Sequence, residues 1–320
     1  SLSPDSAVCD FFLLRNDVHN LKIFIKSKIL GASVDKFFRG TMSRDEWDDV
    51  WQDKSTALPE IFRESVSFVK KVITRHCHNE TLPYTTVQKG EFSNSPIENG
   101  GQGGFAISSH GGMKKEIQSL TIKSSPPLQG GDEGGIKKET LPFIIDLIID
   151  GAYLRYVEDY CKKIEVEIIK RYLETYQLVK GLEIIRRAVA LKLNMNLLNQ
   201  YFVEGFDKGH VFHKLAKNTV WASEQTVRDV LVETHCNASL QGLLLSNLSR
   251  NISFQYEVAT DNYLLDMLRP VKYIPFGPER VFGYFCGLAT EVFNLKLLLG
   301  GKVHRIENNL LKERLRKTYV

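Results

Sequence analysis

Residues 11–31 read FFLLRNDVHNLKIFIKSKILG, and the spacing of their apolar residues predicts an amphipathic helix. Gly31 suits the end of this helix, because glycine tolerates the left-handed conformation that a C-terminal cap requires. Four apolar residues recur at intervals of four and three and therefore share one helical face: Leu14, Val18, Leu21 and Ile25.

The same arrangement returns near the C-terminus. Pro278 suits the first turn of a helix there, and Gly300-Gly301 suits its end. Asn20-Leu21-Lys22 aligns with Asn294-Leu295-Lys296, and Lys28 then falls on Lys302. The apolar stripe of this second copy is Val281, Phe285, Leu288, Val292, Leu295 and Leu299.

A third, weaker copy lies between these two. Its stripe is Leu178, Leu182, Ile185 and Val189. In this copy Arg186 takes the place of Lys22, and Lys192 takes that of Lys28. Because any two amphipathic stripes can be aligned, the repeated basic positions and the shared Asn-Leu-Lys carry most of the information.

The spacing of the copies indicates a repeated domain. The equivalent residues Leu21, Ile185 and Leu295 are 164 and 110 residues apart, and removing the 55 residues of 86–140 from the first interval leaves 109. A unit of about 110 residues suits a domain and is too long for a solenoid repeat. By the same period, about 80 residues of a first unit would precede Ser1. We therefore expect a truncated first domain over 1–31, a second over 32–195 and a third over 196–320.

Residues 86–140 differ in composition from the rest. The stretch from Gly90 to Gly135 holds 11 of the 23 glycines in the chain, several of them in pairs. Glycine at this density has a large conformational entropy in the unfolded chain, and few apolar residues are present to offset it. We expect a disordered insertion in the second domain.

The overall composition narrows the possible functions. The chain has 320 residues, 43% of them hydrophobic, with a net charge of +4 from 42 basic and 38 acidic residues. This near balance argues against nucleic acid as the main partner. No apolar run reaches 18 residues and no secretory signal opens the chain, so neither a membrane span nor secretion is expected. Five widely spaced cysteines suit a reducing compartment.

Motifs for catalysis or metal binding are weak. Gly300-Gly301-Lys302 lacks the spacing of a phosphate-binding loop, and no Gly-x-Ser-x-Gly occurs. His76-Cys77-His78 with His235-Cys236 lacks the paired spacing of zinc ligands. His210 and His213 have no carboxylate partner assigned by motif. Ser43 followed by Glu46 predicts a capping box that opens a helix. We therefore expect no catalytic residue, no metal and no cofactor.

Two segments carry a family resemblance: FLLRNDVHNLKIFIKSKILG (12–31) and IPFGPERVFGYFCGLATEVFNLKLLLGGKVHRI (274–306). They resemble the C subunit of archaeal and bacterial V/A-type rotary ATPases, related to the d subunit of the eukaryotic V-ATPase. The resemblance implies an all-α, funnel-like fold of three similar helical domains related by a pseudo-threefold repeat. It also implies a peripheral position on the cytoplasmic face of the membrane, on the rotor ring, with the central stalk in the funnel cavity. The implied role is transmission of torque between ATP turnover and proton or sodium transport, without nucleotide binding.

Six basic residues recur at equivalent positions of the three copies: Lys22, Lys28, Arg186, Lys192, Lys296 and Lys302. One explanation is that these cations do no more than stabilise the negative C-terminal ends of helices, where cations are common. Our sharper hypothesis is that they contact stalk or ring subunits and provide register and steering. Two alternatives stay open: a general helical adaptor for other proteins, and an all-α enzyme with an unrecognised site.

Overall fold

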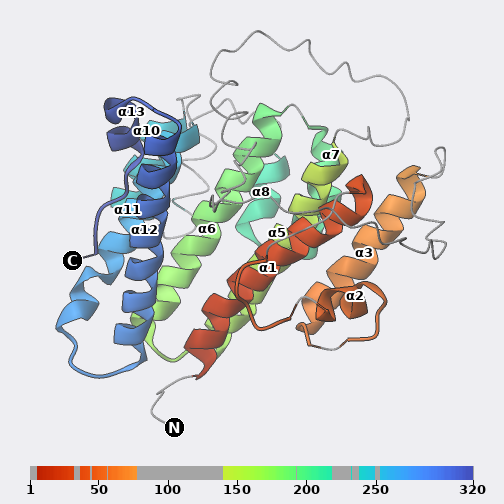
Figure 1. Ribbon diagram of the computed structural model, residues 1–320, viewed down its shortest axis with the longest axis horizontal. Helices are drawn as coiled ribbons and strands as arrows, with labels where there is room; N and C mark the ends of the chain where they lie inside the picture. Colours follow the sequence, from red (N-terminus) through yellow and green to blue (C-terminus); the bar gives the residue numbers. More distant parts are fainter. Residues whose placement is uncertain are drawn as a thin grey trace, which may run out of the picture.

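A computed structural model describes residues 6–31, 37–43, 45–55, 57–77, 140–191, 193–217, 232, 238–248 and 253–319. All regular elements within these ranges are helices (Figure 1). The predicted all-α class is confirmed. The predicted insertion over 86–140 lies, apart from Thr140, outside the described residues, and the three predicted domain boundaries stay predictions.

Long helices dominate the architecture. They are α1 (Ser6–Leu30), α3 (Glu60–Cys77), α5 (Leu141–Lys163), α6 (Glu167–Ala190), α11 (Ser253–Leu268) and α12 (Pro278–Val303). The shorter helices are α2 (Glu46–Trp51), α7 (Met195–Tyr201), α8 (Val211–Lys217), α10 (Ala238–Leu248) and α13 (Asn308–Arg314), with 3₁₀ turns η1 (Val203–Gly205) and η2 (Arg269–Tyr273).

Helix α5 is the centre of the packing. Helices α1, α3, α6 and α7 contact it on different sides. A helix that is apolar all round must be covered all round, and the sequence of α5 meets this condition. Its buried aliphatic residues are Leu141, Ile144, Ile145, Leu147, Ile148, Ile149, Ala152, Leu154 and Val157.

Two carboxylates, Asp146 and Asp150, interrupt the apolar N-terminal part of this helix, and both are paired with α1. Lys22 Nζ lies 2.6 Å from Asp150 Oδ1, and Lys26 Nζ lies 2.6 Å from Asp146 Oδ1. Burial raises the pKa of Asp150, and the charge of Lys22 opposes that rise. The ion pairs therefore set how α1 lies across α5, because an unpaired buried carboxylate is costly.

The predicted first helix is confirmed. Its four stripe residues are buried in the core that α1 shares with α5. The helix ends at Leu30, and Gly31 adopts the left-handed conformation with φ of 66°, as the cap prediction required.

The asparagine of the repeated Asn-Leu-Lys makes the same paired hydrogen bonds in both copies. Asn20 Nδ2 donates to the Phe38 carbonyl and Asn20 Oδ1 accepts from the Phe38 N–H, both at 2.8 Å. Asn294 bonds the carbonyl and N–H of Arg316 in the same way, both at 2.9 Å. In each case a buried amide binds the backbone of a segment that lies outside the helices.

The C-terminal end of α12 corrects one expectation. The helix continues through Gly300 and Gly301 to Val303, and the left-handed residue is Arg305, with φ of 53°. Arg305 is also the residue that the Asn20–Asn294 alignment places opposite Gly31. Gly301 is needed for packing, because a side chain there would collide with Leu311 of α13.

The Ser43–Glu46 capping box forms in part. Glu46 Oε2 accepts from the Ser43 N–H at 2.6 Å and from the Ser43 hydroxyl at 2.8 Å. The N–H bond, and then the hydroxyl bond, lowers the pKa of Glu46. Helix α2 begins at Glu46 with Asp45 at its N-cap, so Ser43 lies two residues before the cap and only its hydrogen bonds to the glutamate are present.

We predict that Asn20→Ala destabilises the protein, because the Phe38 N–H and carbonyl lose the buried amide that satisfies them. Two such bonds predict a loss of about 2–3 kcal/mol in the free energy of unfolding, measured by urea denaturation. The control is Asn16→Ala on the same helix, which removes one exposed hydrogen bond to the Arg39 carbonyl. It should cost less than about 1 kcal/mol. Equal losses in the two variants would contradict the assigned role of Asn20.

We also predict that Lys22→Met destabilises the protein more at pH 8 than at pH 5. Because the folded-state pKa of Asp150 is raised, its proton binding stabilises the fold below its unfolded pKa of about 3.9. That contribution is lost as the pH rises through the folded-state pKa. Removing Lys22 moves this pKa further up, so the ionised, unpaired carboxylate penalises the fold at pH 8.

Urea denaturation at both pH values should show a loss of about 1–3 kcal/mol at pH 8, below the range for fully buried pairs because about a fifth of each side chain reaches solvent. The matched control is Lys28→Met, since the Lys28–Asp48 pair is much more exposed. This variant should change stability by less than about 1 kcal/mol at either pH. A pH-independent loss for Lys22→Met would refute the assignment.

Candidate functional site

Three long helices meet at their N-terminal ends and spread apart toward their C-terminal ends. Figure 1 shows α1, α6 and α12 beginning close together at the bottom of the view and fanning out above. An aromatic cluster joins them at the narrow end. Phe282 of α12 has ring-centroid distances of 5.3 Å to Phe12 of α1 and 5.2 Å to Tyr172 of α6.

A cleft of about 110 Å³ lies where these helices diverge. Helices α1, α6, α11 and α12 and the C-terminal segment all contribute to it. Its polar lining comprises Arg15, Tyr172, Tyr176, Lys180, Asp261, Cys286, Thr290 and Arg316. The cleft is partly open and combines several helices with a set of charged side chains.

Two of the three cations in the cleft are neutralised within the chain. Arg316 Nε lies 3.1 Å from Asp261 Oδ2, and Lys180 Nζ lies 3.0 Å from Glu183 Oε2. Burial by itself lowers the pKa of Lys180, but Asp261 and Glu183 raise it above its usual value. Arg15 is solvent-exposed and lies near Tyr153, Tyr172 and Tyr176, and it forms no ion pair with a carboxylate of the described residues. Its guanidinium is therefore available to a carboxylate from outside.

The thiol in the cleft is not set up as a nucleophile. Burial raises the pKa of Cys286 to about 12, so it is a neutral thiol near pH 7. Burial likewise raises the pKa of Cys161 to about 12. A reactive cysteine needs the opposite shift, because the thiolate is the nucleophile. The chemistry of this cleft is suited to binding charged groups.

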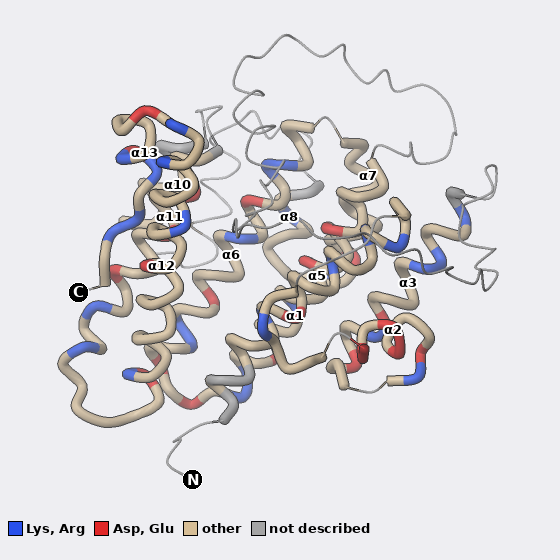
Figure 2. The backbone as a smooth tube through the Cα atoms, viewed as in Figure 1, with Lys and Arg blue, Asp and Glu red and all other residues tan. Residues whose placement is uncertain are grey.

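Two of the six predicted contact residues form ion pairs within the chain. Lys22 pairs with Asp150 as described above, and Lys28 Nζ lies 2.7 Å from Asp48 Oδ1. The second pair lies beside α2, where Figure 2 shows acidic residues gathered. Both lysines thus help to hold α1 against its neighbours.

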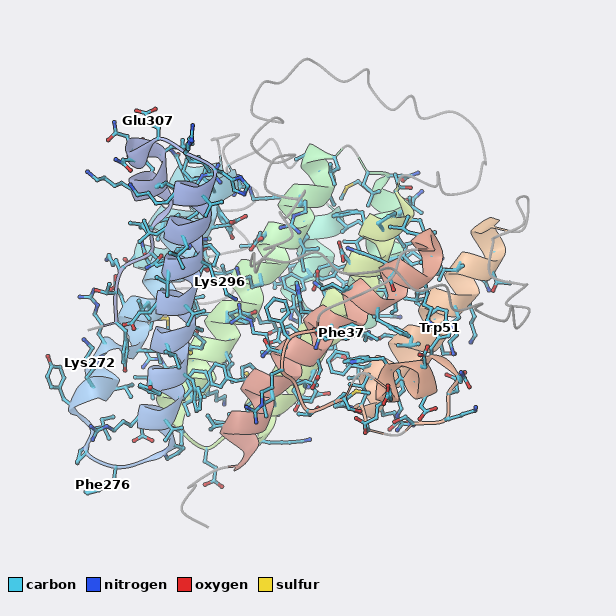
Figure 3. All side chains as sticks on the ribbon, viewed as in Figure 1. Phe37, Trp51, Lys272, Phe276, Lys296 and Glu307 are labelled. Atoms are coloured by element: carbon cyan, nitrogen blue, oxygen red, sulfur yellow. The ribbon has the colours of Figure 1, made fainter. Side chains whose placement is uncertain are left out.

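The other predicted contact residues lie on α6 and α12. Arg186 stacks 4.5 Å over the Tyr256 ring, and Lys296 lies 5.2 Å over the Phe38 ring. Figure 3 shows Lys296 partway along α12. Lys302 Nζ donates to Asn308 Oδ1 at 2.8 Å. Lys192 lies outside the described residues. The helices diverge, so these side chains are spread over three helices, and their role as partner contacts stays a prediction.

The histidines at 210 and 213 serve local structure. His210 Nδ1 accepts from the Phe212 N–H at 3.3 Å, and His213 Nε2 lies 2.9 Å from the Phe206 carbonyl oxygen. Both contacts join residues close in the sequence, two and seven positions apart. The described parts of the chain contain no group of three His, Cys, Asp or Glu side chains that could hold a metal. His78, His235 and Cys236 lie outside those parts.

Sequence reasoning missed the cleft. Arg15, Lys180 and Arg316 come from distant parts of the chain, and none belongs to a motif. The one sequence feature that could have pointed to Arg15 is its position less than two helical turns before Asn20-Leu21-Lys22.

Helix α12 is unusual in composition. It is the one described helix that is long and apolar enough, by length and composition, to cross a membrane. About a third of its apolar window is buried against other parts of the chain. Buried residues of α12 include Phe282, Cys286 and Leu297. One face of α12 is therefore part of the hydrophobic core.

Comparison with known proteins identifies the family. A family model described as ATP synthase (C/AC39) subunit matches residues 132–314, which is more than half of the chain. The comparisons with curated proteins and with solved structures found no match. The matched region includes α5 at the centre of the core and α6, α11 and α12 of the cleft, whereas α1 and Arg316 lie outside it. The chain therefore belongs to the ATP synthase (C/AC39) subunit family, whose members are non-catalytic structural subunits of rotary ATPases.

Proposed function

We propose that this chain is the central-stalk coupling subunit of a V/A-type ATP synthase or ATPase. It joins the rotor stalk to the proteolipid ring in the membrane and transmits torque that couples ATP turnover to proton or sodium transport. The family match over residues 132–314 carries this proposal.

The arrangement of the long helices supports a role in holding a partner. Helices α1, α6 and α12 are joined at one end by aromatic contacts and diverge at the other. A coupling element must be stiff, and buried aromatic packing at the junction provides stiffness. The cleft offers the exposed guanidinium of Arg15, which has no carboxylate partner among the described residues, to an acidic group of the partner.

The helices also suggest how the chain is organised. We propose that α5–α6 and α11–α12 are equivalent helix pairs and that α1 is the second helix of another such pair. The like hydrogen bonds of Asn20 and Asn294 and the left-handed Gly31 and Arg305 support this equivalence. The units are residues 1–31, 32–195 and 196–320 in a pseudo-threefold, funnel-like arrangement.

The proposed partners are stalk subunits and the membrane ring, with the chain peripheral on the cytoplasmic face. The proposed contact residues are Arg15 and the six repeated cations, among which Lys296 and Lys302 have no carboxylate partner among the described residues. These two residues give the most direct test, because reversing their charge breaks no ion pair.

We predict that Lys296→Glu with Lys302→Glu weakens assembly with stalk and ring by roughly tenfold, because like charges then face each other across the contact. The measurement is the yield of stalk and ring subunits that co-purify from membranes with the tagged chain. The control is Lys54→Glu with Lys71→Glu, an equal charge change at two exposed lysines outside the proposed contacts.

Circular dichroism should show the same helix content in both double variants. Unchanged co-purification of the Lys296/Lys302 variant would contradict the contact assignment. If the unmodified chain does not co-purify with a membrane ring, it is instead a general helical adaptor.

A further inference from the structure

Helix α12 carries an unusual exposed apolar surface. We name it the α12 stripe and define it as Leu288, Val292, Leu295, Leu299 and Val303. These side chains are between 40% and 71% exposed, and their spacing places them on one helical face. The face that α12 buries includes Phe282, Cys286 and Leu297, so the stripe is a second apolar face. Contiguous exposed apolar surface of this kind usually marks an interaction site.

The corresponding stripe on α1 is fully covered. Leu14, Val18, Leu21 and Ile25 align with the first four residues of the α12 stripe, yet they are at most 5% exposed. Helix α5 covers this side of α1. Lys22 pairs with Asp150 and Lys26 pairs with Asp146, so the two helices run antiparallel. In this interface, an antiparallel helix covers the apolar stripe and places a carboxylate against the lysine beside it.

Helix α6 repeats the pattern with α11. Leu182 and Ile185 of its stripe are buried, whereas Val189 at its C-terminal end is 37% exposed. Tyr256 of α11 donates a hydrogen bond to the Val179 carbonyl at 3.1 Å. Arg186, at the position of Lys22, stacks over Tyr256. Helix α5 thus covers the stripe of α1, and α11 packs on the central part of the stripe of α6. No described helix covers the α12 stripe in this way.

We propose that the α12 stripe binds an amphipathic helix of a partner polypeptide, antiparallel to α12, with an acidic residue opposite Lys296. Lys296 has the place on α12 that Lys22 has on α1, and it is exposed beside the stripe (Figure 3). In the α1–α5 interface that place receives the carboxylate of Asp150. The proposal does not depend on the coupling role, since it follows from the internal interfaces alone.

The charges on α12 disfavour two other occupants. A second copy docked antiparallel on the stripe would have its symmetry axis near Leu295, and the two Lys296 side chains would then face each other. A lipid surface favours helices with many basic residues beside the apolar face. Helix α12 carries three basic residues, Arg280, Lys296 and Lys302.

The test places a photo-crosslinking amino acid at Leu295 of the full chain in its own cells. The expected crosslink joins position 295 to a partner segment with apolar residues at helical spacing and an Asp or Glu within about one turn of the attachment point. The matched control places the same amino acid at Phe276, which is 85% exposed in the loop before α12 (Figure 3). That position should not capture the same segment.

A charge exchange completes the test. Lys296→Glu should lower the crosslink yield about tenfold, and changing the captured acidic residue to Lys should restore it. Capture of a second copy, of lipid, of a segment without helical apolar spacing, or of nothing would overturn the proposal, as would failure of the exchange. Stalk and ring subunits are measured in the same purification. Their absence would contradict the coupling role without affecting the crosslink result, and a missing crosslink would contradict the stripe proposal without affecting the coupling role.

Discussion

The aromatic contact around Phe282 is the interaction on which the arrangement of the long helices depends. This fully buried ring lies between Phe11 and Phe12 of α1 and Tyr172 of α6. Because the contact joins the N-terminal ends of three helices, their crossing angles make the other ends diverge. The cleft lined by Arg15, Lys180 and Arg316 exists because of this divergence.

Charge has two different uses in the molecule. In the core, Asp146 and Asp150 require Lys26 and Lys22, and the pairs determine how α1 lies on α5. At the cleft, Lys180 pairs with Glu183 and Asp261, and Arg316 pairs with Asp261 and Glu257, which leaves Arg15 as the cation of the cleft without a carboxylate partner among the described residues. A scaffold that binds another protein needs both: ion pairs that fix its own helices, and charges that are left for the partner.

The same local pattern leads to different burial on different helices. The apolar spacing of α1 and α12 is alike, and Asn20 and Asn294 bond their returning segments alike. Yet the stripe is core on α1 and surface on α12, because α5 lies against one and no described helix lies against the other. Apolar periodicity reports which residues share a face, and the neighbouring helix decides whether that face is buried.

The sequence alone determined the all-α class and the helix predicted for residues 11–31 with its Gly31 cap, because helical spacing and capping are local properties of the backbone. It also aligned Asn20 with Asn294, two residues that make like hydrogen bonds. It was wrong about the end of α12, since the use of Gly301 depends on contact with Leu311 of α13. It could not find the cleft, whose residues are up to 301 positions apart, from Arg15 to Arg316. It also could not assign Lys22 to Asp150 rather than to a partner. Only the tertiary structure decided these points, because long-range packing sets which charges meet and which faces stay open.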